Sequence, residues 1–298
     1  MFHNLLIIFK LVLVITVITS FLVTIITVDN EDLEPLSTFT RGISVKKEPI
    51  PDNINLVSGP WVGSSWNKEN EDWLLQFRDP KRIKQIPYIN LYIVAGMASA
   101  KKGLGDCNVG LSETKTLCKN GANFIREYQS ELTQAWTNTA YSIKKNYGSY
   151  KPIFLHFEPD YYQYQEHSQN GGRMTAKELA SLMNTWTDVY KKVLPNAKLV
   201  MDISSWTYDM PYWSKQFNNF DYGGMVGRRF DPDYAQTDNT KTPKTYKELI
   251  QQSGKKMIVN DSYGAGGKWL PYNSQWNNED LVNARIADGV VAVIQPPN

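Results

Sequence analysis

The chain has 298 residues, 42% of them hydrophobic, which is enough to bury the core of one barrel-sized domain or of two smaller ones. Its 32 basic and 30 acidic residues give a net charge of +2 without a long basic run, which argues against a nucleic-acid partner. The nine Trp and seventeen Tyr are a heavy aromatic load, and exposed rings commonly pack against the apolar faces of sugars.

The N-terminal region predicts a membrane segment. The eighteen residues from Leu11 to Val28 are apolar apart from Thr and Ser, which is long enough to span a bilayer. Lys10 precedes this run and acidic residues follow it, so we expect the remainder outside the cytoplasm. We expect an uncleaved signal anchor over residues 1–29, and a secreted protein if the segment is instead a cleaved signal peptide. Residues 30–55 are polar and interrupted by prolines, as expected of a linker.

From Val57 onward, short apolar runs alternate with amphipathic stretches, a pattern typical of a parallel sheet covered by helices. Seven strands are predicted, over residues 60–64, 89–95, 153–158, 198–203, 223–227, 256–261 and 290–295. The clearest helices span residues 121–146 and 175–193, and Thr175 and Glu178 form a capping box at the start of the second. We therefore expect a single α/β domain over residues 56–298.

The cysteine and histidine content favours a disulfide over a metal site. Cys107 and Cys118 are eleven residues apart in a polar loop, and in an exported chain such a pair is expected to be oxidised. Neither a CxxC motif nor a GxSxG motif is present. The three histidines are spread along the chain, and His156 lies within a predicted strand, as a core residue would. No metal and no cofactor is implied.

Acidic residues follow four of the predicted strands: Asp106, Glu158 with Asp160, Asp202, and Asp261. Because the carboxyl ends of parallel strands meet at the ligand-binding face of an α/β fold, we expect these acids to lie near one another. Glycoside hydrolysis needs one protonated and one ionised carboxyl group. Asp160, beside Glu158 and several tyrosines, is the expected acid, and Asp106 or Asp261 is the expected ionised partner. Each acid alone also fits an ordinary turn or helix cap.

The expected partner is a polysaccharide or oligosaccharide. Rings and polar groups at the strand ends would contact it, although any single ring also fits a core position. The candidates are Trp61, Tyr92, Tyr162, Asp202, Trp206, Trp269 and Gln295.

Several of these motifs, in this order, resemble glycoside hydrolase family 6. They are Glu158-Pro159-Asp160 after an apolar strand, Asp106-Cys107 in the preceding loop, Asp202 on the next strand, and the terminal Gln295-Pro-Pro. The resemblance implies a distorted, seven-stranded β/α barrel of the TIM type that acts on a cellulose-like β-glucan with inversion. It further implies Asp160 as general acid, Asp106 as its helper and Asp261 as base.

The chain departs from that family in three places. Gln295 stands where the family has a Lys, and the loop from Tyr92 to Asp106 is longer, which leaves open whether Asp106 reaches the site. Cys118 lies before the strand that ends at Glu158, whereas the family's partner cysteine lies after it. A weaker resemblance, to retaining (β/α)₈ glycosidases, implies Glu158 as acid/base and Asp261 as nucleophile. The alternative to an enzyme is a non-catalytic carbohydrate-binding or adhesion protein on a degenerate hydrolase barrel.

Overall fold

The computed structural model describes residues 36–45, 50–107, 115–165, 174–204, 207, 209–226, 244–263, 269 and 271–297. None of the helices in these ranges is both long and apolar enough to cross a membrane. The predicted membrane segment, Leu11–Val28, lies outside the described residues, as does Trp206. The chain divides into residues 1–37 and residues 38–298, and the second unit is described below.

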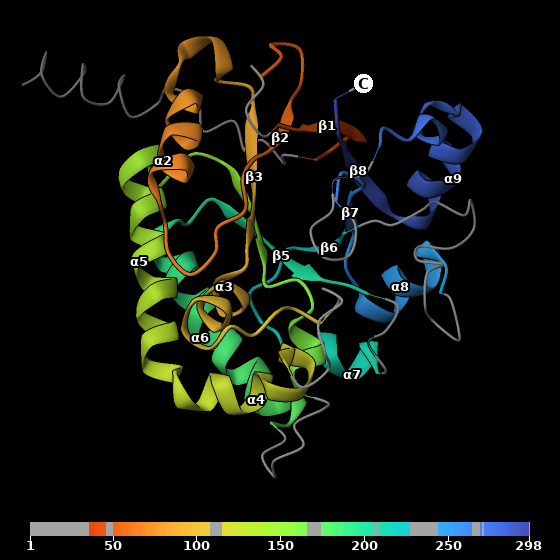
Figure 1. The fold of residues 1–298 in the computed structure, drawn as a ribbon. Helices are drawn as coiled ribbons and strands as arrows, with labels where there is room; N and C mark the ends of the chain where they lie inside the picture. Colours follow the sequence, from red (N-terminus) through yellow and green to blue (C-terminus); the bar gives the residue numbers. More distant parts are fainter. Residues whose placement is uncertain are drawn as a thin grey trace, which may run out of the picture. The chain divides into compact units, whose positions relative to one another are not determined.

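Eight parallel strands form a closed barrel in which each strand pairs with the next along the chain (Figure 1). The barrel closes where the last strand pairs with the first. The predicted α/β barrel is confirmed, but the predicted number of seven strands is wrong. The strands are β1 (Thr40–Ser44), β2 (Leu56–Ser58), β3 (Ile86–Leu91), β4 (Ile153–Phe157), β5 (Ala197–Asp202), β6 (Tyr222–Val226), β7 (Met257–Asn260) and β8 (Val290–Gln295).

The strand that the prediction missed is β1, which lies within the stretch expected to be a linker. Its sequence, TRGIS, has no apolar run, and most of its residues are only partly buried. It is nevertheless paired on both sides, with β2 and with β8. The domain therefore begins before residue 56, and the second strand is Leu56–Ser58 rather than residues 60–64.

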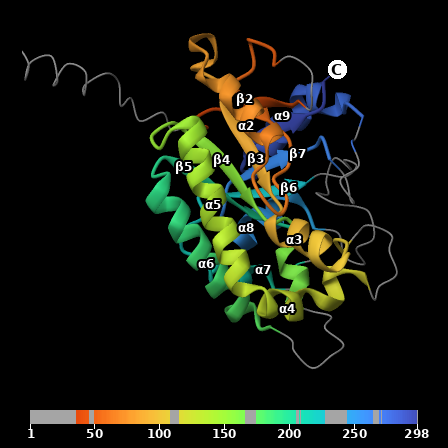
Figure 2. The same cartoon turned by 60° about the vertical axis from the view of Figure 1, so that its left-hand side comes forward.

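Helices surround the barrel, and α5 and α6 run side by side along one flank (Figure 2). The predicted helix over residues 121–146 is two helices, because the backbone at Tyr128 (φ −111°, ψ 19°) leaves the helical region. The capping box of Thr175 and Glu178 is confirmed at the start of α6. The helices are α2 (Lys68–Leu75), α3 (Ile93–Lys102), α4 (Leu117–Glu127), α5 (Gln129–Tyr147), α6 (Ala176–Val193), α7 (Met210–Ser214), α8 (Tyr246–Ser253) and α9 (Glu279–Asp288), with short 3₁₀ turns including η4 (Tyr161–Gln165) and η6 (Ser274–Asn277).

Strand side chains alternate between two layers, as the period of two in a β-strand requires. The outward residues pack against the helices, where the Trp136 ring stacks on Phe157 at 5.0 Å and on Trp186 at 5.3 Å. The inward residues fill the barrel, with Phe154 lower on β4 and His156 nearer its carboxyl end. The barrel therefore carries its bulky apolar core outside the sheet, between strands and helices.

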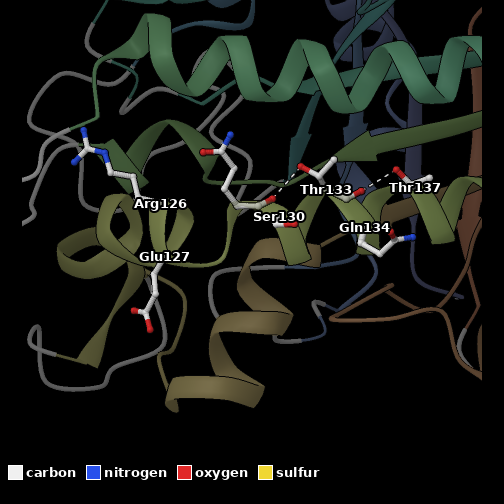
Figure 3. Close-up of a pocket in the computed structure, with 7 residues that line it drawn as sticks. Arg126, Glu127, Ser130, Thr133, Gln134 and Thr137 are labelled. Atoms are coloured by element: carbon white, nitrogen blue, oxygen red, sulfur yellow. Dashed lines mark hydrogen bonds between the residues drawn. The ribbon is translucent and has the colours of Figure 1, made fainter.

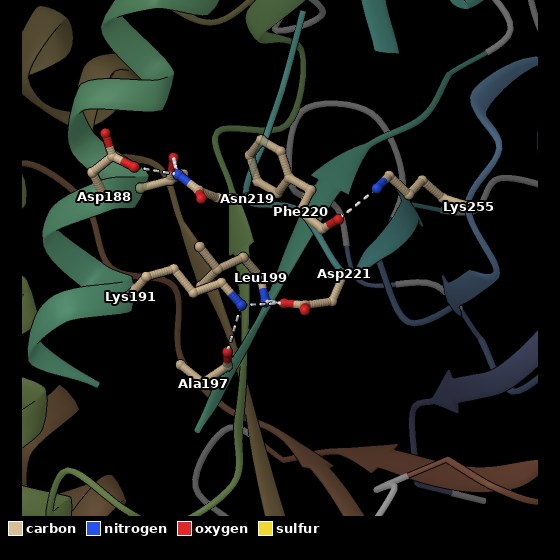
Figure 4. Close-up of polar contacts among 9 residues, drawn as sticks. Asp188, Lys191, Ala197, Leu199, Asn219, Phe220, Asp221 and Lys255 are labelled. Carbon is tan, nitrogen blue, oxygen red and sulfur yellow. Dashed lines mark hydrogen bonds and ion pairs between the residues drawn. The ribbon is translucent and has the colours of Figure 1, made fainter. Parts of the chain in front are cut away.

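A polar network closes the amino-terminal ends of β5 and β6 (Figure 4). The carboxylate of Asp221 accepts hydrogen bonds from the Lys191 ammonium and from the backbone N–H of Leu199, both at 2.7 Å. Lys191 also donates to the carbonyl of Ala197, and Lys255 donates to the carbonyl of Phe220. These contacts connect α6, and the residue Lys255 just before β7, to the amino-terminal ends of β5 and β6. The network therefore stabilises this end of the barrel.

Replacing Asp221 with Ala is expected to lower the free energy of unfolding by about 1–3 kcal/mol, because the Leu199 N–H loses its acceptor. Asp221→Asn, which keeps an acceptor oxygen, is expected to cost less. Urea denaturation measures both, with Asp52→Ala at an exposed position as the matched control. Equal effects for Asp221→Ala and Asp52→Ala would show that the network does not stabilise the barrel.

Candidate active site

The turn Glu158-Pro159-Asp160, directly after β4, has an unusual backbone. Glu158 and Asp160 have positive φ angles of 35° and 73°, which are uncommon for residues with a side chain. Such strain persists only where the surroundings fix it, and it concentrates at functional sites. The turn leads straight into η4, so Asp160 and the η4 side chains are presented together at the carboxyl end of β4.

Glu158 connects this turn to the first turn of α3. Its carboxylate accepts hydrogen bonds from the backbone N–H groups of Val94 (2.9 Å) and Ala95 (2.8 Å), and from the Tyr164 hydroxyl (3.4 Å). The side chain is fully buried, and burial raises the pKa of Glu158 to about 8, against the opposing effect of the two N–H groups. Both carboxylate oxygens are therefore committed to the protein itself.

Asp106 and Asp160 form a carboxyl pair. Asp106 Oδ1 accepts from the backbone N–H of Cys107 (2.8 Å) and from the Tyr164 hydroxyl (3.1 Å), and the Gln163 amide donates to Asp160 Oδ1 (2.7 Å). Burial raises the pKa of both carboxyl groups, and each group affects the pKa of the other. The Cys107 N–H and the Tyr164 hydroxyl oppose this rise at Asp106, so Asp160 is the more readily protonated of the two. Burial, followed by the charge of Asp106, raises the pKa of Asp160 well above its ordinary value.

Asp202, the last residue of β5, is the fourth acid at this point. Its Oδ2 accepts from the backbone N–H of Asp160 at 3.4 Å, and its Oδ1 lies 3.8 Å from Nε2 of His156. Burial raises the pKa of Asp202 to about 7. Unlike Glu158, the side chains of Asp106, Asp160 and Asp202 are partly exposed. These four acids are called the acid cluster below.

Asp261 and Gln295 make their contacts elsewhere. Asp261 follows the inward-facing Asn260 on β7 and accepts a hydrogen bond from Trp276 Nε1 of η6 at 2.9 Å. Burial raises the pKa of Asp261 to about 6. Gln295 is buried and donates to the carbonyl of Asn273 at 2.8 Å. The structure therefore does not bring the predicted base, Asp261, together with the acid cluster.

An aromatic wall adjoins the acid cluster. Trp61 stacks on Tyr92 with ring centroids 4.4 Å apart and contacts Tyr263 at 4.8 Å, and Tyr263 contacts Trp269 at 5.0 Å. Burial and then the acids, Asp160 first among them, raise the pKa of Tyr92 well above its ordinary value, which places the wall beside them. The aromatic wall comprises Trp61, Tyr92, Tyr263 and Trp269.

Tyr162, which was expected to contact substrate, packs in the core instead. Its ring meets Trp213 edge-on at 5.3 Å, and only 9% of the residue is exposed.

The predicted disulfide between Cys107 and Cys118 is confirmed. Because the Cys107 N–H donates to Asp106, the disulfide anchors the segment that presents this acid. Despite the longer loop, Asp106 reaches the site. After Tyr92 the chain forms α3, and Asp106 then accepts a hydrogen bond from Tyr164 within the cluster. Among the residues that the structure describes, no group of His, Cys, Asp and Glu side chains is arranged to hold a metal ion.

Gln163 and Tyr263 were not among the predicted site residues, and Tyr164 was expected only as one of the tyrosines beside Asp160. Gln163 and Tyr164 follow Asp160 by three and four residues, which is one turn of a helix, and that spacing was the signal available. Tyr263 carries a weaker signal, since it follows Asp261 by two residues at the end of a strand.

A separate surface groove crosses α4 and α5 (Figure 3). Its lining is polar, and the hydroxyls of Thr133 and Thr137 donate to carbonyls of their own helix. It contains none of the acid cluster and no aromatic ring, so it is not the candidate active site. The lining residues are Arg126, Glu127, Gln129, Ser130, Thr133, Gln134 and Thr137.

No protein-family model and no curated protein matches this sequence. Among solved structures, GH26C from Muricauda sp. MAR_2010_75 is similar, with a TM-score of 0.57 and 10% identity over 89% of this chain and 80% of that one. A ruminal GH26 endo-β-1,4-mannanase (TM-score 0.49, 8% identity) matches over 88% of this chain but 59% of its own length. An old yellow enzyme homologue from Zymomonas mobilis (TM-score 0.48, 11% identity) matches over 81% and 75%. At these identities the likeness shows the barrel fold alone.

Stability is expected to fall as pH rises from about 5 to about 8. The pKa values of Glu158 (about 8), Asp202 (about 7) and Asp261 (about 6) all lie above their ordinary values. The folded chain therefore holds protons in this window that the unfolded chain has released. Denaturant unfolding at pH 5, 6.5 and 8 measures the slope.

Asp202→Asn is expected to flatten this slope, because Asn does not titrate, whereas Asp188→Asn, at an exposed position on α6, should leave it unchanged. A free energy of unfolding that rises from pH 5 to pH 8 would contradict the assignment of these raised pKa values.

Proposed function

We propose that the protein is a glycosidase that hydrolyses a β-linked polysaccharide, with Asp160 as the general acid. The observation that carries this proposal is the carboxyl pair, in which the Cys107 N–H and the Tyr164 hydroxyl donate to Asp106 and stabilise its anion beside a partly exposed Asp160 whose raised pKa favours the protonated form. Glycosidic bonds are cleaved by such a combination of one protonated and one ionised carboxyl group. The pair lies at the carboxyl end of a parallel barrel, which is where barrel enzymes bind their substrates.

The contacts assign a task to each group. Asp160, whose pKa is raised, donates its proton to the oxygen of the scissile bond. Gln163, which donates to Asp160 Oδ1, fixes the orientation of the acid. The Asp106 anion, held by the Cys107 N–H and the Tyr164 hydroxyl, stabilises the positive charge that develops on the sugar ring.

Asp160 has more support as the acid than Glu158. Both oxygens of Glu158 accept hydrogen bonds from the protein, and the residue is fully buried. A retaining scheme would need Glu158 to reach the substrate and Asp261 to act as the nucleophile. Because neither residue is placed for these tasks, inversion is the proposed stereochemical course.

The substrate class is proposed from the aromatic wall. Partly exposed Trp61 and Trp269, on either side of Tyr263, offer flat apolar surfaces beside the acids, and pyranose rings pack on such surfaces. The motifs shared with glycoside hydrolase family 6 favour a cellulose-like β-glucan.

Asp160→Asn is expected to lower the hydrolysis rate by about 10²–10⁴-fold, because the variant cannot donate the proton. Reducing-sugar release from a panel of β-glucans and β-1,4-mannan measures this, and NMR of the first-formed anomer reports inversion or retention. Asp188→Asn is the matched control on the surface. If only Glu158→Gln abolished activity in a folded protein, the retaining scheme would replace this one.

The second candidate is a non-catalytic carbohydrate-binding protein on the same barrel. It is favoured by Gln295, which stands where family 6 has a Lys and is buried against the Asn273 carbonyl.

Trp61→Ala is expected to weaken glycan binding by about tenfold or more, since it removes a stacking surface from the aromatic wall. Titration calorimetry with a soluble oligosaccharide measures the affinity, and Tyr150→Ala, a highly exposed ring elsewhere, serves as the control. A wild-type protein that binds the oligosaccharide through Trp61 but releases no sugar would favour the binding function over hydrolysis.

A further inference from the structure

Beneath the acid cluster, the inward-facing positions of the barrel carry polar side chains. Each of the following is buried and has a side-chain atom without a hydrogen-bond partner: Ser44, Ser58, Asn90, His156 and Asn260. Buried polar atoms are nearly always paired, so orphan atoms need an explanation. Of these five residues only His156 can change its charge, and it lies directly against the acid cluster.

The contact of His156 with Asn90 indicates which ring nitrogen carries the proton. Its Nδ1 lies 3.1 Å from Oδ1 of Asn90, its lateral neighbour on β3. An amide oxygen can only accept, so Nδ1 is the donor. Burial lowers the pKa of His156 to about 3, which keeps the ring neutral. Its Nε2 therefore presents a bare lone pair.

That lone pair faces Asp202. The distance from Nε2 to Asp202 Oδ1 is 3.8 Å, slightly longer than a hydrogen bond. The neighbouring strand leaves room for the ring, because a Cβ at Gly224 would come within 2.9 Å of Nε2. Strand pairing sets His156 beside Val200 and Asp202 beside Gly224, so the two side chains occupy adjacent levels of the barrel interior.

We propose that His156 is a positioning residue for Asp202: its Nε2 lone pair favours the neutral, carboxylic acid form of Asp202 beneath the Asp106–Asp160 pair. An ionised carboxylate facing a lone pair is repelled, whereas a carboxylic acid can donate to it. This inference rests on the proposed function, because it assigns a state to one acid of the same site.

The groups around Asp202 determine which other pKa values depend on whether Asp202 is neutral or ionised. The groups that face Asp202 are the Asp160 backbone N–H, the Ser204 hydroxyl, the Asp106 carboxylate and the phenols of Tyr88 and Tyr92. An ionised Asp202 would add a second negative charge beside Asp160 and raise the pKa of Asp160 further. By keeping Asp202 neutral, His156 leaves Asp160 acidic enough to give up its proton.

The test measures protonation directly, independently of hydrolysis. ¹⁵N NMR of the three histidines, with the His156 signals identified by their loss in His156→Gln, is expected to show the Nδ1–H tautomer at pH 7. ¹³C NMR of the Asp202 carboxyl is expected to give a midpoint of about 7 in the wild type. The midpoint should fall in His156→Asn, which lacks an atom at the Nε2 position. It should fall further, by about one pH unit or more, in His156→Gln, whose amide can donate to the ionised carboxylate.

Ser58→Ala, in the same inner layer but without a titrating group, should leave the Asp202 midpoint unchanged. In an active enzyme, the basic limb of the pH–rate profile is expected to move to higher pH in His156→Gln, which a packing defect alone would not produce. An Nε2–H tautomer, or an Asp202 midpoint that is the same in the wild type and His156→Gln, would overturn the inference. Absence of hydrolysis by the wild type would instead count against the proposed function and leave these NMR outcomes to decide the role of His156.

Discussion

The arrangement of the site depends on one buried carboxylate. Glu158 accepts the first free N–H groups of α3, where a helix leaves its donors unsatisfied and favours negative charge. Since Glu158 is also the first residue after β4, this contact ties the end of that strand to the helix that follows β3. The Tyr164 hydroxyl bonds to Glu158 and to Asp106, so the same group connects η4 to the pair. The strained turn that presents Asp160 is thus fixed by α3 through Glu158 and by η4 through Tyr164.

Helix α3 also connects the acids to the aromatic wall. On its other side, Gly96 lies so close to the segment after β2 that an added Cβ would come within 2.3 Å of the Ser64 backbone nitrogen. That segment carries Trp61, and it is paired with the end of β3 through Val62. The stacking partner of Trp61 is Tyr92, the residue immediately before α3. One helix therefore sets the position of the aromatic wall relative to Asp160.

Local sequence predicted the Glu158–Asp160 motif, Asp106 and the disulfide, because each is a short pattern at the end of an apolar run. It did not predict β1, whose pairing is supplied by β2 and β8 rather than by its own apolar residues. Asp202 and Asp261 had the same appearance in the sequence, but Asp202 occupies an inward position and Asp261 comes one residue after an inward one. Because successive side chains of a strand point to opposite faces, a shift of one position determines whether an acid lies inside the barrel with the acid cluster or in the outer layer.

The acidic residues at the two ends of the barrel differ in whether their charge is balanced by a cation. At the amino-terminal end, Asp221 is matched by the Lys191 ammonium and a backbone N–H, an arrangement that stabilises the fold. At the carboxyl end, four acids are gathered in a desolvated site, where like charges raise one another's pKa. Such a cluster favours retaining protons, and retained protons are what an acid catalyst transfers. His156, which contacts Asn90 through Nδ1 and lies 3.8 Å from Asp202 through Nε2, is the residue that we propose to influence where those protons reside.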